Sequence, residues 1–66
     1  MSEPFSTPDK ATIHRAMARL DGFARGLGLD EATTRQIVEA VVDDMPDQPE
    51  EERLAEARRR MIVASA

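Results

Sequence analysis

Apolar positions between residues 8 and 27 recur at helical spacing. They follow one another at intervals of four, three, four and three residues, and two more apolar side chains widen the stripe: Ile13, Met17, Leu20, Ala24 and Leu27, flanked by Ala16 and Phe23. This period is typical of a helix with one face in a core. The stretch Thr7-Pro8-Asp9 offers a capping hydroxyl, a proline at the first helical position and an early acid. The pattern therefore predicts a helix over residues 8–27.

Two further helices are predicted by the same kinds of signal. Asp30 can cap a helix over residues 31–45, which Pro46 prevents from continuing. Its β-branched run could form a strand, but the helical period, the cap and the lack of a pairing strand favour a helix. Asp47 and Glu50 match a capping box at the start of a third helix, over residues 48–63. The apolar face of the second helix comprises Ile37, Val38, Val41, Val42 and Met45.

The third predicted helix has the thinnest apolar stripe, formed by Leu54, Ala57 and Met61. Acids gather in its first turn and three arginines near its end, an order that matches the helix macrodipole. Because so little of its surface is apolar, we expect this helix to be the least stable and the most dependent on a partner.

Together these elements predict an all-α fold, a small three-helix bundle with up-down-up topology over residues 7–66. Residues 1–6 are predicted to be a disordered, flexible tail. Gly26 and Gly28 can end the first helix, and Gly22, which is unfavourable inside a helix, leaves open a kink or an early end there. A core in a chain of 66 residues is small, so a homodimer is compatible with this fold.

The amino-acid composition limits the expected cellular location of the protein and the classes of molecule that it can bind. Thirteen acids against nine bases give a net charge of −4, which disfavours nonspecific binding to nucleic acid or anionic lipid. The chain has no cysteine, which excludes disulfides and thiolate metal sites and fits a cytoplasmic protein. No signal sequence or membrane span is present in the pattern, so we expect no membrane association.

Few residues suggest a catalytic, metal-binding or cofactor-binding role. His14 is the single histidine, and we expect it to lie at the surface or at the edge of the core. The sequence contains no nucleophile elbow, no phosphate-binding glycine loop and no calcium-binding loop. We therefore predict that the protein is not an enzyme and holds no cofactor or metal.

The segment FARGLGLDEATTRQI, residues 23–37, resembles the helix-turn-helix of bacterial regulators. The resemblance implies a recognition helix that presents Arg35 and Gln36 to DNA. The segment departs from that family at Thr34, where an aliphatic residue is usual. It also departs in charge, because residues 30–44 contain five acids and only one base. A minimal DNA-binding regulator is therefore the alternative function.

Two surfaces are candidates for binding another protein. On the first helix, Gly22 and its neighbours form a shallow furrow flanked by Arg15 and Arg19, which would accept a helix with acidic edges. The second surface is the end of the third helix, where charge meets aliphatic side chains. We predict a small bacterial or phage regulatory or adaptor protein that acts by helix-mediated binding. The predicted partner-binding residues are Arg15, Arg19, Gly22, Arg58, Arg59, Arg60, Met61 and Ile62.

Overall fold

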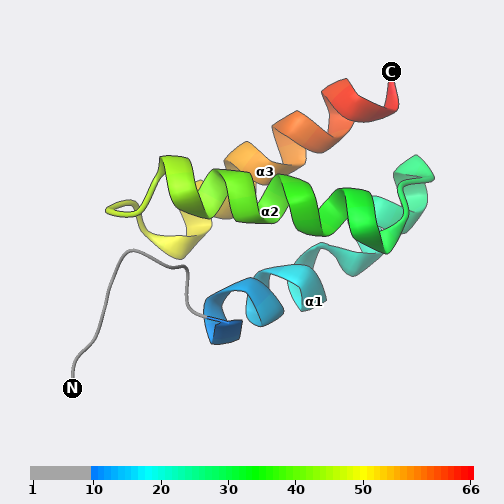
Figure 1. The fold of residues 1–66 in the computed structure, drawn as a ribbon. Helices are drawn as coiled ribbons and strands as arrows, with labels where there is room; N and C mark the ends of the chain where they lie inside the picture. The colour runs from blue at the N-terminus through cyan, green and yellow to red at the C-terminus, as the bar shows by residue number, and fades with distance from the viewer. Residues whose placement is uncertain (1–9) are drawn as a thin grey trace.

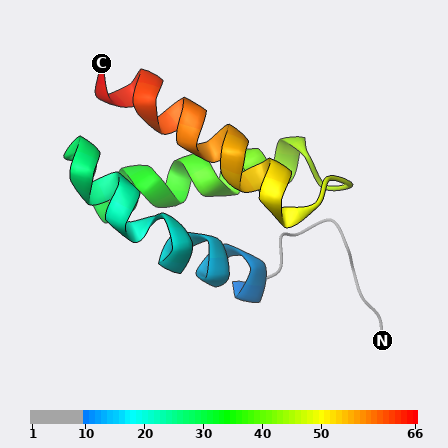
Figure 2. The same cartoon turned by 180° about the vertical axis from the view of Figure 1, so that it is seen from behind.

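The computed structural model describes residues 10–66 and consists of three packed helices. They are α1 (Lys10–Leu27), α2 (Glu31–Asp44) and α3 (Glu50–Ser65). α1 and α3 run in the same general direction, and α2 crosses them in the opposite direction on the other side of the bundle (Figures 1 and 2). The predicted all-α, up-down-up bundle is confirmed. The predicted tail and the Thr7-Pro8-Asp9 helix start lie outside the described residues.

α1 ends at a glycine in the left-handed region. Gly28 has a φ of 78°, and its N–H donates to the Arg25 carbonyl at 3.1 Å while the Leu29 N–H donates to the Ala24 carbonyl at 3.0 Å. This pair of bonds is the Schellman arrangement that closes a helix. The helix continues through Gly22 to Leu27, so its predicted end at residue 27 is confirmed and the alternative of an early end at Gly22 is excluded. The left-handed turn at Gly28 alone ends the helix.

Asp30 caps α2 as predicted. Its Oδ1 accepts a hydrogen bond from the Thr33 N–H at 2.9 Å. Hydrogen bonds from Thr33, through its side chain and its backbone N–H, lower the pKa of Asp30. The charged carboxylate is therefore the form that stabilises the start of this helix.

Because Asp30 caps α2 in its charged form, the free energy of unfolding should decrease when this carboxylate is protonated at low pH. Because the pKa of Asp30 is lower in the folded state, its contribution is present above the ordinary carboxyl range and is lost as pH falls through the lowered pKa. Urea unfolding followed by circular dichroism at about pH 6 and about pH 3 should show a smaller loss of stability for Asp30→Asn than for the parent chain. Asparagine is the matched control, since it caps without titrating. Equal losses in the two chains would contradict this role.

The start of α3 differs from the prediction. The helix begins at Glu50 and ends at Ser65, and its N-cap is Pro49, which makes no side-chain capping bond. The predicted Asp47–Glu50 capping box is therefore wrong. Pro49 is itself extended, with φ −64° and ψ 160°, so it lies outside the helix rather than in its first turn.

A residue that the sequence analysis did not single out holds the α2–α3 loop. Arg53 Nη1 donates to the Gln48 carbonyl at 2.7 Å, with longer contacts to the carbonyls of Met45 and Pro46 at 3.4 and 3.5 Å. A guanidinium group can bond several carbonyls at once because it carries five donors in one plane. The loop is therefore held by a side chain from the first turn of α3.

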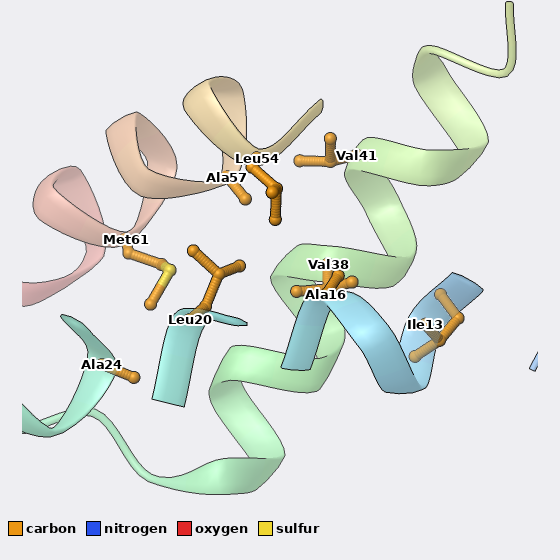
Figure 3. Close-up of a cluster of buried hydrophobic side chains, with 9 residues drawn as sticks. All are labelled: Ile13, Ala16, Leu20, Ala24, Val38, Val41, Leu54, Ala57 and Met61. Atoms are coloured by element: carbon orange, nitrogen blue, oxygen red, sulfur yellow. The ribbon is translucent and has the colours of Figure 1, made fainter. Parts of the chain in front are cut away.

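The core lies between all three helices. Leu20 of α1 and Met61 of α3 are fully buried and lie toward each other at its centre (Figure 3). The nine buried apolar residues are Ile13, Ala16, Leu20, Ala24, Val38, Val41, Leu54, Ala57 and Met61. Three of the nine are alanines, so the core is small even for a chain of this length.

The structure changes the edges of the predicted stripes. On α1, Ala16 is buried while the predicted core residue Met17 is only half-buried. On α2 the buried positions include Thr34, whose hydroxyl donates to the Asp30 carbonyl at 2.9 Å. That bond satisfies the hydroxyl, so a polar side chain can occupy a core position. The α3 stripe of Leu54, Ala57 and Met61 is confirmed.

Candidate protein-binding surface

Two ion pairs show which flank of α3 faces each neighbouring helix. Arg60 Nη2 lies 3.0 Å from Asp44 Oδ2 at the end of α2, so the Arg60 flank faces α2. Arg15 Nε of α1 lies 3.9 Å from Glu50 Oε2 of α3. Because successive helical residues turn by about 100°, Arg58 lies on the opposite flank from Arg60, on the side of α1.

The same geometry orients α1. Arg15 faces α3, and residues four, seven and eleven positions further on share its side of the helix. Arg19 and Gly22 therefore lie on this side together with Gly26, all of them exposed. Figure 2 views the bundle with α1 and α3 both on the near side. We call this surface the α1/α3 face, and it comprises Arg15, Arg19, Gly22, Gly26, Arg58 and Ile62.

The α1/α3 face unites residues that the sequence analysis had assigned to two separate surfaces. The furrow on α1 and the end of α3 are distant in sequence, yet the parallel course of α1 and α3 brings both to one side of the bundle. Periodicity within each helix predicted which residues point outward. Only the packing of α1 against α3 joined them.

This face combines open backbone with available positive charge. A Cβ atom built at Gly22 or at Gly26 would meet nothing within 4 Å. Arg19 and Arg58 are exposed and form no ion pair with any residue from 10 to 66. Ile62 is 52% exposed, so its aliphatic side chain is accessible on this face. The arrangement can accept a closely approaching backbone together with acidic and apolar side chains.

Three of the predicted binding residues make contacts within the bundle. Met61 is fully buried in the core, so its side chain is not available at the surface. Arg60 donates to Glu56 at 2.8 Å and to Asp44 at 3.0 Å, and Arg59 donates to Glu56 at 2.9 Å. Glu56 thus accepts hydrogen bonds from two arginines of its own helix. Within the basic cluster, Arg58 is the member that carries no such carboxylate bond.

These bonds also shift the titration of the groups involved. Hydrogen bonds from Arg60 first, and then from Arg59, lower the pKa of Glu56. Hydrogen bonds to Glu56 and then to Asp44 raise the pKa of Arg60. Arg60 therefore remains charged, and its pair with Asp44 connects α3 to the end of α2.

The outward face of α2 is acidic. Arg35 Nη2 donates to Glu31 Oε2 at 3.2 Å, so the one base of this helix is paired within the helix. Glu39 and Asp43 are exposed and form no ion pair with any described residue. A recognition helix with this charge would repel the phosphate backbone.

The described part of the chain contains neither a candidate metal site nor a helix that could span a membrane. Residues 10–66 contain no group of three or more histidine, cysteine or acidic side chains placed to hold an ion. His14 is exposed on α1. None of the three helices combines the length and the apolar character that crossing a bilayer requires.

Comparison with known proteins adds no relative. No protein-family model, no curated protein and no solved structure matches this chain. The functional argument therefore depends on the geometry of the described residues.

Proposed function

We propose that this chain is a small, non-enzymatic regulatory or adaptor protein of the cytoplasm, of a bacterial or phage type, that binds another protein. Binding occurs on the α1/α3 face. The observation that carries the proposal is the presence, on one side of the bundle, of two open glycines, an exposed isoleucine and two arginines that form no ion pair with residues 10–66. Small residues allow two helices to approach closely, while arginines and large apolar side chains contribute most to interfaces.

The chemistry of the face suggests the chemistry of its partner. An amphipathic helix with acidic edges could lie along α1, with its backbone close to Gly22 and Gly26. Its acids would pair with Arg19 and Arg58, and its apolar side would cover Ile62 and the half-buried Phe23. This is the helix-in-groove mode of recognition, in which apolar anchors supply affinity and charges at the edge select the partner.

Crosslinking can test this face because the chain contains no cysteine. A photo-crosslinker attached to Gly26→Cys should capture a partner protein, since a side chain at this position meets no neighbouring atom. The same crosslinker on Asp47→Cys, in the exposed α2–α3 loop, is the matched control. Capture from Gly26 should exceed capture from Asp47, as the α1/α3 face predicts.

Charge reversal then tests the mechanism. Arg19→Glu together with Arg58→Glu should weaken the captured complex by more than ~1 kcal/mol, measured by titration with the purified partner. Glu51→Lys with Glu52→Lys, at exposed acids in the first turn of α3, controls for a change of total charge. Unchanged affinity after the arginine reversal would refute the proposed face.

The alternative function makes an opposite prediction. A DNA-binding regulator would lose affinity for a specific duplex after Arg35→Ala and Gln36→Ala, and its affinity would fall steeply with added salt. We expect no specific duplex binding, because Arg35 is paired with Glu31 and the rest of the α2 surface is acidic. A nanomolar specific complex with DNA at physiological salt would replace the proposed function.

A further inference from the structure

A second surface lies on the α1–α2 side of the bundle and shares only Arg15 with the α1/α3 face. A broad, shallow groove runs between α1 and α2, and no residue of α3 lines it. Its walls include the half-buried Met17 and Leu29 and two small exposed residues, Ala18 and Ala40. The groove therefore offers apolar surface with little side-chain bulk above it.

The two rims of the groove carry opposite charge. Lys10 and His14 lie on the α1 rim, and Glu39 and Asp43 lie on the α2 rim. Because α1 and α2 are antiparallel, these four residues lie toward the same end of the groove, near the start of α1 and the end of α2 (Figure 1). Toward the other end, each rim pairs its own charges, Arg25 with Asp21 on α1 and Arg35 with Glu31 on α2.

The rims do not neutralise each other within one molecule. Among residues 10–66, ion pairs join α1 to α3 and α2 to α3, but none joins α1 to α2. Arg25 pairs with Asp21 on its own helix, at 3.3 Å. Lys10, Glu39 and Asp43 form no ion pair with any described residue. The charge on either side of the groove therefore remains available to another molecule.

Such a surface is complementary to itself. A two-fold axis along the groove would place the α1 rim of one copy over the α2 rim of the other, and the same contact would occur twice. The mainly basic α1 rim of each copy then faces the mainly acidic α2 rim of the other. A two-fold axis across the groove would instead place like charges together, so the charge pattern selects one geometry.

We propose that this groove is the interface of a homodimer of the chain, with the α1 rim of each copy against the α2 rim of its partner. The small, alanine-rich core favours a second copy of the chain as the partner in this groove, because burial of Met17 and Leu29 between two copies would enlarge the apolar core. Apart from Arg15, which lines the edge of the groove, the α1/α3 face stays open in this dimer. The homodimer and the proposed function can thus fail independently.

Sedimentation equilibrium and native mass spectrometry of the full chain test the dimer. The parent chain should dimerise, and added salt should weaken the dimer because its rim charges are screened. Glu39→Lys with Asp43→Lys makes both rims basic, and Lys10→Glu with His14→Glu makes both rims acidic. Each variant alone should show a dimer dissociation constant at least about tenfold higher than that of the parent.

Mixing the two variants provides the decisive measurement. All rim contacts between an all-basic and an all-acidic copy are favourable, so the mixture should form heterodimers about as tightly as the parent forms homodimers. Glu51→Lys with Glu52→Lys, outside the groove, should leave dimerisation unchanged. Circular dichroism should show that every variant is helical. If a charge reversal unfolds the chain, Glu39→Gln with Asp43→Asn should still weaken the dimer.

Three outcomes would overturn the proposal. The first is a parent chain that remains monomeric at millimolar concentration. The second is a dimer that the rim variants do not weaken, which would place the interface elsewhere. The third is a mixture of variants that forms no heterodimer, since this would show that the rims do not meet in the proposed orientation.

Discussion

Met61→Ala should destabilise the protein by about 2–5 kcal/mol, because it removes a fully buried side chain from the centre of a small core. Met61 lies against Leu20, where α1 and α3 meet, and its neighbours come from separate helices (Figure 3). These neighbours cannot easily close the resulting cavity without shifting a helix. For a chain of 66 residues, a loss of this size should lower the melting temperature by about 10 °C or more, and it approaches the total stability.

Ile62→Ala provides the control at the next position of α3. Ile62 is 52% exposed, so its truncation should change stability by less than about 0.5 kcal/mol. Both variants should be unfolded thermally and by urea at the same protein concentration, since dimerisation would make stability depend on concentration. Similar losses for the two variants would contradict the orientation of α3, whereas a large loss for Met61→Ala alone would establish it.

Two glycine-to-alanine substitutions in the same segment should have opposite effects. Gly28→Ala should cost about 1–2 kcal/mol, because residue 28 has a positive φ that strains any side chain. Gly22→Ala should stabilise the protein by up to ~1 kcal/mol, since residue 22 lies inside α1 and a Cβ atom there meets nothing within 4 Å. The difference follows from backbone conformation, because both positions have open space around them.

Urea unfolding monitored by circular dichroism measures both effects in identical buffers. Gly26→Ala is a second test, because Gly26 is helical, has no positive φ and is equally open. It should behave like Gly22→Ala. If Gly28→Ala proved neutral, the left-handed end of α1 would be incorrect, and if Gly22→Ala were destabilising, α1 would not continue through that position.

Local signals predicted the α1–α2 connection well. The Gly28 turn and the Asp30 cap each act through hydrogen bonds to residues no more than five positions away. Their chemistry is therefore visible in a short stretch of sequence. The start of α3 was not predictable in this way. Arg53, within the helix, donates a hydrogen bond to the Gln48 carbonyl of the preceding loop, and Pro49 has an extended backbone.

Burial at the edges of the apolar stripes also depended on tertiary contacts. Met17 and Ala16 are neighbours in sequence, and periodicity alone allowed either to face the core. Packing buried Ala16 and left Met17 half-buried beside the groove. Thr34 entered the core because its hydroxyl bonds the Asp30 carbonyl at the start of its own helix. Hydrophobicity was therefore an incomplete guide at both positions.

By itself, the sequence determined the number of helices, their approximate bounds and the residues along the centre of each inward stripe. The tertiary structure alone decided which flank of each helix meets a neighbour. It therefore gave Arg60 and Arg58 different environments, joined the α1 and α3 surfaces into one face, and set oppositely charged rims along the α1–α2 groove. Helical periodicity specifies the direction of a side chain about its own axis, whereas the rotation and crossing of helices depend on packing between residues distant in sequence.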